Sequence, residues 1–187
     1  IYPKFELVKA QEGEDWQVRA VTCELPDVSL GNYKKLISEA KKTKPKEQTR
    51  EEKEQEVIKI LLETVKLSFA KILIDTETNI KLSNLLARLE KLGLTLESYL
   101  TSIGKTAESL RQEYEKGVKD SVALELILGK VAEEEKIQIS DRQIDSAVQA
   151  LKADPNVKDT LDSPEQRKYI ENTLKRRRAL DSLTALM

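Results

Sequence analysis

The sequence predicts a mostly α-helical protein, with an elongated multi-helix body and protruding arms, preceded by a short β-hairpin or sheet edge. The composition is the first observation: 39% of residues are hydrophobic, 4% aromatic and 35% charged, a balance that favours long, solvent-exposed helices over a thick globular core. Second, sequence patterns that begin helices recur from Thr49 onward. Third, the alternation of apolar and polar residues that is typical of strands is confined to the first 33 residues.

The N-terminal segment, 1–33, is predicted to form two strands. Phe5 to Val8 and Trp16 to Leu25 flank the tetrapeptide EGED, and the second run alternates and is rich in Val, Thr and Trp. Because two strands alone are marginally stable in water, we expect either the edge of a sheet whose remainder precedes Ile1 or a hairpin laid on the helices. Cys23 is expected to be a small residue on one face of a strand.

A charged connector is predicted over 34–50. This segment is rich in lysine and contains Pro45, which does not fit a helix interior. Between Lys34 and Lys59 there are nine basic and six acidic residues, a net charge of +3. The pattern fits a solvated linker that leads into a helix, and it also fits a docking patch for an acidic partner.

The rest of the chain, 51–187, is predicted to be a helical domain. Three pairs have the spacing of a capping box, in which two residues satisfy each other's backbone donors at a helix start: Thr49 with Glu52, Ser140 with Gln143, and Ser163 with Gln166. Pro164 strengthens the last start, and Thr76 and Thr106 are expected to cap helices without an acidic partner. The predicted helices span 50–72, 76–92, 96–103, 107–136, 141–153 and 164–186.

Apolar residues are distributed unequally over these helices. Helix 76–92 has a single stripe formed by Leu82, Leu85, Leu86, Leu89 and Leu92. In contrast, the apolar residues of 57–73 surround much of the helix, and those of 122–128 form an almost continuous belt. A helix that is apolar on more than one side is either buried on more than one side or exposes apolar surface. The surplus is therefore either the core of a helical bundle or, in part, a groove for apolar side chains of another chain.

The last helix carries the basic run Lys175 to Arg178. From Ser163 onward six basic and three acidic residues give a net charge of +3, whereas five basic and eight acidic residues give −3 between Thr106 and Lys136. Antiparallel docking of these two helices would pair the charges, and we prefer it to an RNA-binding patch because the helix offers only Tyr169 for base stacking.

Several function classes are disfavoured. The chain has no histidine, which removes the usual general base near neutral pH and the commonest zinc ligand, and its one cysteine cannot form an internal disulfide. The six glycines never lie within ten residues of each other, so no phosphate-binding loop exists. A net charge of −1 and the lack of a long apolar run argue against nucleic-acid and membrane partners. We therefore predict a protein that is not an enzyme and that has no cofactor and no metal.

Residues 93–114, GLTLESYLTSIGKTAESLRQEY, followed by VALELILGKVAEEEKIQISDRQID, resemble the C-terminal domain of trigger factor, a bacterial ribosome-associated chaperone family. In that family a helix ends in a glycine-leucine turn, a short helix follows, and a GKT motif opens a long arm helix. The resemblance covers most of the chain, from about Thr49 to Leu186, and LPDVSLGNYKKL looks like the end of the family's ribosome-binding domain. One departure is Ser109, which replaces the acidic residue expected to complete the cap begun by Thr106.

The resemblance implies an ATP-independent holdase in the cytoplasm that binds unfolded or nascent polypeptides. Residues 1–33 would be the remainder of a ribosome-binding-type domain, so ribosome contact would need a missing N-terminal region. The family's ribosome-docking loop is absent from these residues and the prolyl isomerase domain has no room, so neither activity is assigned. Residues predicted to contact client peptides are Leu82, Leu85, Leu86, Leu89, Leu94, Leu96, Tyr99, Leu100 and Ile103.

Other interpretations stay open at this point. A periplasmic, SurA-like chaperone would share the helical architecture and differ in its cellular location. A structural scaffold would bury the surplus apolar surface in an obligate dimer, and a chaperone could itself form a weak homodimer. RNA binding through Lys175 to Arg178 is a further alternative.

Overall fold

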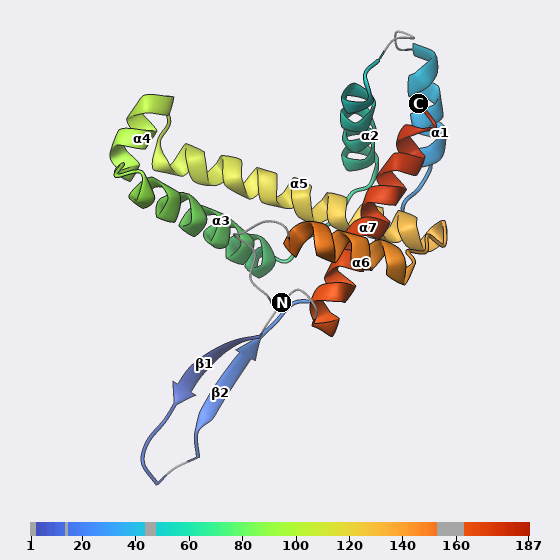
Figure 1. Ribbon diagram of the computed structural model, residues 1–187. Coiled ribbons are helices and arrows are strands. Elements are labelled where there is room, and N and C mark those ends of the chain that lie inside the picture. The colour runs from blue at the N-terminus through green and yellow to red at the C-terminus, as the bar shows by residue number, and fades with distance from the viewer. Residues whose placement is uncertain (1–2, 14, 44–47, 153–162) are drawn as a thin grey trace. The chain divides into compact units, whose positions relative to one another are not determined.

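The computed structural model describes residues 3–13, 15–43, 48–152 and 163–187 and confirms a mostly α-helical chain preceded by a β-hairpin (Figure 1). The elements are β1 (Lys4–Lys9), β2 (Gln17–Val21), α1 (Tyr33–Thr43), α2 (Arg50–Thr64), α3 (Lys71–Lys91), α4 (Leu96–Ile103), α5 (Ala107–Glu134), α6 (Asp141–Lys152) and α7 (Pro164–Thr184). They fall into two compact units, each described separately below. Unit 1 comprises Ile1–Asp27 and Leu67–Ser121, and unit 2 comprises Val28–Lys66 and Val122–Met187.

The hairpin of unit 1 is a two-stranded antiparallel sheet with a bulge between Leu7 and Lys9. Glu6 lies opposite Arg19 in the register, and their charged groups are 3.9 Å apart. Most apolar side chains of both strands are exposed, with Phe5 68% and Val18 57% accessible, and Val21 is half-buried. Residue 14 of the predicted turn lies outside the described residues.

The helical part of unit 1 consists of α3, the short α4 and the first half of α5. Arg111 on α5 donates a hydrogen bond of 3.0 Å to the side-chain oxygen of Asn79 on α3, so these two helices run side by side (Figure 1). Leu110 and Val118, which are eight residues apart on α5, are buried. The unit is therefore a helical hairpin whose corner is α4.

Unit 2 consists of α1, α2, the second half of α5, α6 and α7. Its core includes the apolar belt predicted at 122–128: Ala123, Ile127 and Leu128 are buried, and Val122, Leu124 and Leu126 are half-buried. A second cluster joins Ile144 and Val148 of α6 to Ile170 of α7. The belt is thus core packing, which was one of the two interpretations of its sequence.

Several boundaries differ from the sequence predictions. The second strand, predicted over Trp16 to Leu25, ends at Val21, so Cys23 lies after the strand and not on one of its faces. The connector predicted over 34–50 is helix α1 in its first part, with Tyr33 and Ile37 buried one turn apart; residues 44–47, including Pro45, lie outside the described residues. The helix predicted over 50–72 ends at Thr64, and α3 begins at Lys71, so Thr76 lies inside a helix and does not cap one. Residue 153, the predicted end of α6, also lies outside the described residues.

The absence of glycine and proline explains why the sequence does not predict the break between α2 and α3. No such residue occurs between Thr49 and Leu92, so the sequence carries no local stop signal where α2 ends. Val65 turns to an extended conformation, and Ala70 precedes α3 without any side-chain cap. Val57, Leu61 and Val65 are buried before the break between the two helices, and Leu73 and Ile74 are buried after it. The end of α2 is therefore set by tertiary packing and not by a local sequence signal.

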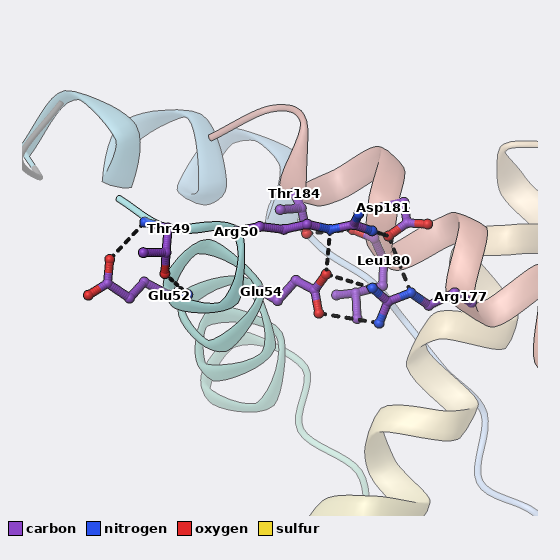
Figure 2. Close-up of polar contacts among 8 residues, drawn as sticks. All are labelled: Thr49, Arg50, Glu52, Glu54, Arg177, Leu180, Asp181 and Thr184. Carbon is purple, nitrogen blue, oxygen red and sulfur yellow. Dashed lines mark hydrogen bonds and ion pairs between the residues drawn. The ribbon is translucent and has the colours of Figure 1, made fainter. Parts of the chain in front are cut away.

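Helix starts follow the predicted caps closely. The Thr49–Glu52 capping box is complete, with hydrogen bonds of 2.9 and 3.2 Å (Figure 2). Ser163 caps α7 through one half of the predicted box, since its hydroxyl accepts from the Gln166 amide at 3.2 Å, and Pro164 takes the first helical position. Before α6 the Gln143 side chain accepts from both the amide and the hydroxyl of Ser140 at 3.1 Å. At the start of α5 the Ser109 hydroxyl accepts from the Thr106 amide at 3.0 Å, so serine performs the role expected of an acidic residue.

The basic run Lys175 to Arg178 makes contacts within unit 2. Docking on the acidic helix accounts for Arg176 alone, which pairs with Glu125 of α5 at 2.9 Å. The other partners differ from the prediction: Lys175 pairs with Glu171, Arg177 with Glu54 of α2, and Arg178 with the carbonyl oxygen of Gln138. The preference for intramolecular pairing is consistent with these contacts, although the acidic partners are spread over several elements.

A further ion pair secures α1 to the end of α5. The Lys34 ammonium lies 3.0 Å from Glu135, and the hydrogen bond between them raises the pKa of Lys34. Ser182 of α7 donates to the other oxygen of Glu135 at 3.0 Å. In the part of the chain that the structure describes, no helix is long and apolar enough to cross a bilayer.

Candidate functional site

The stripe of α3 is covered at its centre and open at its edges. At about 100° per residue, Leu89 lies in the middle, Leu82 and Leu85 lie within about 40° of it, and Leu86 and Leu92 lie about 60° to either side. Exposure follows this order: Leu89 is 5% exposed, Leu82 and Leu85 are half-buried, and Leu86 and Leu92 are 46% and 71% exposed. The same face carries Thr78, which is buried.

This gradient separates packing from available surface. A side chain that is almost wholly buried has no apolar area to offer a ligand without a rearrangement of the helices. Leu89, one of the residues predicted to contact clients, is therefore part of the packing of unit 1 in this structure. Leu86 and Leu92 flank it with apolar surface that faces solvent.

The turn after α3 holds further apolar side chains at the surface. Gly93 has φ 67°, Leu94 donates its amide to the carbonyl of Leu89 at 2.9 Å, and Gly93 donates to Glu90 at 3.0 Å. This is the Schellman ending of a helix, which needs a residue in the left-handed conformation and most often uses glycine. It leaves Leu94 45% exposed, directly before Thr95, whose hydroxyl caps α4.

Helix α4 contributes the remaining predicted contact residues. Leu96 and Ile103 are 36% and 37% exposed, and Tyr99 and Leu100 are half-buried. Gly104 ends the helix at φ 63° with a second Schellman pattern, in which Lys105 donates to the carbonyl of Leu100.

An open hollow of about 520 Å³ lies at this corner of unit 1, between the end of α4 and the start of α5. Its lining residues are Leu96, Glu97, Leu100, Thr101, Gly104, Lys105 and Thr106. Lys105 is held in an ion pair with Glu113 of α5, so one wall of the hollow is tied to the long helix. A hollow of this volume can hold one or two large side chains of another chain.

The chemistry of this surface is that of apolar contact among charges of both signs. Lys71 pairs with Asp75 on α3, and Lys119 pairs with Glu115 on the neighbouring helix α5. Among the described residues there is no group of three or more side chains spaced to hold a metal ion. The arrangement presents apolar side chains that can contact apolar side chains of another molecule.

Eight of the nine predicted contact residues therefore keep some accessible surface, and all nine lie in unit 1. Within α3, α4 and the turn between them, two exposed apolar residues do not belong to the predicted set, Leu92 and Ile80. Leu92 lies on the predicted stripe, so the stripe itself was the signal. Ile80 is 49% exposed on the opposite side of α3, where no sequence pattern singles it out.

Comparison with known proteins agrees with the resemblance seen in the sequence. A family model described as the C-terminus of bacterial trigger factor protein matches residues 29–185. The chain is 26% identical over 123 residues to a trigger factor of Agathobacter rectalis, which covers 66% of this chain and 28% of that protein. It is 25% identical over 138 residues to a trigger factor of Halothermothrix orenii, covering 74% of this chain and 31% of that protein.

A solved structure from work on the domains of trigger factor from Thermotoga maritima has a similar fold. It superposes with a TM-score of 0.53 at 18% identity and covers 73% of this chain and 81% of that chain. The chain spans between about a quarter and a third of the length of the curated relatives it matches.

Proposed function

The chain belongs to the trigger factor family, a family of chaperones, and from this premise we propose that it is an ATP-independent holdase that binds unfolded or nascent polypeptides. The single observation that supports the binding site is a set of apolar side chains on α3, α4 and the turn between them, of which five are exposed and two, Tyr99 and Leu100, are half-buried. We call this set the arm surface: Leu86, Leu92, Leu94, Leu96, Tyr99, Leu100 and Ile103. Leu82 and Leu85 adjoin it as half-buried members of the α3 stripe.

The energetics of such a surface favour weak and reversible binding. Burying a methylene group is worth about 0.8 kcal/mol, so a few leucine contacts provide modest affinity once the ordering of an unfolded segment has been offset. Leucine side chains adapt to many partners, because they impose no directional hydrogen bonds. This suits a protein that must bind many unrelated unfolded segments and release them without an energy source.

We place this activity in the cytoplasm, where the family's nascent clients are made. In this proposal 1–33 is the remainder of a ribosome-binding-type domain, 34–50 is the connector, of which α1 is a part, and 51–187 carries the chaperone activity. The match to the family model from residue 29 onward supports the last of these assignments. The ion pairs of Lys175, Arg176 and Arg177 and the hydrogen bond of Arg178 within unit 2 favour a structural role for these residues over RNA binding.

The test is suppression of aggregation. A chemically unfolded model protein is diluted into buffer that contains no nucleotide, with and without a stoichiometric amount of the chain, and light scattering is followed. We expect the chain to slow the rise in scattering. An unchanged rise would contradict the holdase proposal for this chain.

The competing use of the arm surface is a permanent dimer of the structural-scaffold kind. Sedimentation over a wide range of concentrations distinguishes the two. A holdase with a weak apolar surface should be monomeric at low micromolar concentration, whereas an obligate dimer would not dissociate.

A further inference from the structure

Two arginines and two carboxylates alternate around a closed set of contacts between α2 and α7, both in unit 2 (Figure 2). Glu54 accepts hydrogen bonds from Arg50 at 3.0 Å and from Arg177 at 2.7 Å. Asp181 lies 2.7 Å from Arg50 and 3.3 Å from Arg177. We call these four residues the charge ring. Each cation touches both anions, and each anion touches both cations.

The first half of α2 contacts α7 through these charged side chains. None of the side chains of residues 50–56 is buried, whereas the second half of the helix buries Val57 and Leu61. On the α7 side the ring lies next to the core, since Ala179 and Leu180 are buried. The N-terminal turns of α2 are thus held by charge and by their cap, and the C-terminal turns by apolar packing.

The order of the charges makes the ring selective for one alignment. Each helix carries arginine followed four residues later by a carboxylate: Arg50 and Glu54 on α2, Arg177 and Asp181 on α7. The observed antiparallel pairing brings Arg50 to Asp181 and Glu54 to Arg177. Parallel pairing, or a slip of one turn, would bring arginine to arginine or carboxylate to carboxylate, which is unfavourable.

Local effects on each helix do not explain this order. Within a single helix, an acidic residue placed four residues before a basic one is the more favourable sequence, and both helices have the reverse. The pKa of Arg50 is raised, mainly by its hydrogen bonds to Glu54 and Asp181, which indicates that both carboxylates act on it. The arrangement therefore serves the contact between helices.

We propose that the charge ring is an electrostatic latch: it fixes the antiparallel register of α2 on α7, and it releases the first two turns of α2 when the charges are screened or broken. The side chains of Arg50 and Arg177 are 62% and 50% exposed, so salt can reach them, while Glu54 is only 16% exposed and cannot be solvated fully without opening the contact. The contact between α6 and α7 also includes an ion pair, Arg167 with Asp145 at 2.6 Å, but the buried side chains of Ile144, Val148 and Ile170 hold these two helices together when salt screens that pair.

The experiment is hydrogen exchange by mass spectrometry on the whole 187-residue chain, comparing amides of 50–56 with those of α6. Arg177→Glu should speed exchange over 50–56 by about fivefold or more and leave α6 within about twofold. Lys168→Glu, the same charge change on α7 outside the ring, is the matched control and should leave both segments unchanged. In the unaltered chain, raising salt from about 0.05 to about 0.5 M should speed exchange over 50–56 alone.

Reversal of all four charges decides between a ring and a general charge effect. A variant with all four charges reversed restores the alternation: Arg50→Glu, Glu54→Arg, Arg177→Glu and Asp181→Arg. On a logarithmic scale of the exchange rate over 50–56, it should recover at least half of the protection that Arg177→Glu removes. A smaller recovery would overturn the proposal, and so would exchange over 50–56 that responds to neither salt nor Arg177→Glu. If Arg177→Glu fails to fold, Arg50→Met replaces it as the single variant, with the same expected direction and the same criteria.

Discussion

Three helices of this chain end at a residue in the left-handed backbone conformation. Three helices end with the same pair of hydrogen bonds, and the residue in the left-handed conformation is Gly93 after α3, Gly104 at the end of α4 and Lys136 after α5. Lys136 has φ 52°, a conformation that costs a residue with a Cβ about 1 kcal/mol relative to glycine. The two glycines carry no such cost.

Replacing this lysine is therefore expected to stabilise the chain. Lys136→Gly should raise the free energy of unfolding by about 0.5 to 1 kcal/mol, measured by denaturant unfolding, because the gain from relieved strain exceeds the loss of one exposed charge. The reciprocal variant, Gly104→Ala at φ 63°, should destabilise by a similar amount. If both variants shifted stability in the same direction, left-handed strain would not be the cause.

At the scale of elements, the sequence predicted helices well where local chemistry decides their ends and poorly where packing does. The caps at Thr49, Thr106 and Ser163 were predicted at the correct residues because their hydroxyls accept from the amide three positions further along the chain. The start of α3 after Ala70 has no side-chain cap, so no residue could have indicated it. Helix α1 was missed because lysines and Pro45 outweighed the weaker signal of Tyr33, Ile37 and Ala40 at helical spacing.

The candidate site was predictable to the same degree. The periodicity of α3 identified the stripe, and the gly-leu turn and the short helix after it were placed correctly. Periodicity cannot distinguish the centre of a stripe from its edges when the width of the covering element is unknown. That is why Leu89 was grouped with Leu86, although the structure buries the first and exposes the second.

Helix α5 permits a prediction at the scale of an element. Gly117 and Gly129 lie inside it, and a Cβ placed on either would meet no atom within 4 Å. Gly117→Ala and Gly129→Ala should each raise the free energy of unfolding by about 0.5 to 1 kcal/mol, because alanine loses less backbone entropy in a helix. Thermal unfolding followed by circular dichroism measures this, and a fall in midpoint for either variant would show that the glycine serves a contact that the present structure does not contain.

For the whole molecule, the distribution of apolar surface is the central feature. The runs at 57–73 and 122–128, which looked like surplus in the sequence, are buried or half-buried. Of the helical segments, α3 and α4 with their connecting turn hold most of the strongly exposed leucines and isoleucines. Both units therefore bury apolar residues in their own packing, and in unit 1 the arm surface keeps a group of apolar side chains accessible.

The most direct test removes the arm surface and leaves the rest intact. Leu86, Leu92 and Leu94, which are 46%, 71% and 45% exposed, are changed together to serine, and suppression of aggregation is compared with that of the unaltered chain. The control changes three exposed apolar residues of unit 2 to serine: Leu36, Leu151 and Tyr169. With helix content equal by circular dichroism, we predict that the arm variant loses most of its holdase activity and the control keeps it; equal activity in the two variants would contradict a client-binding role for the arm surface.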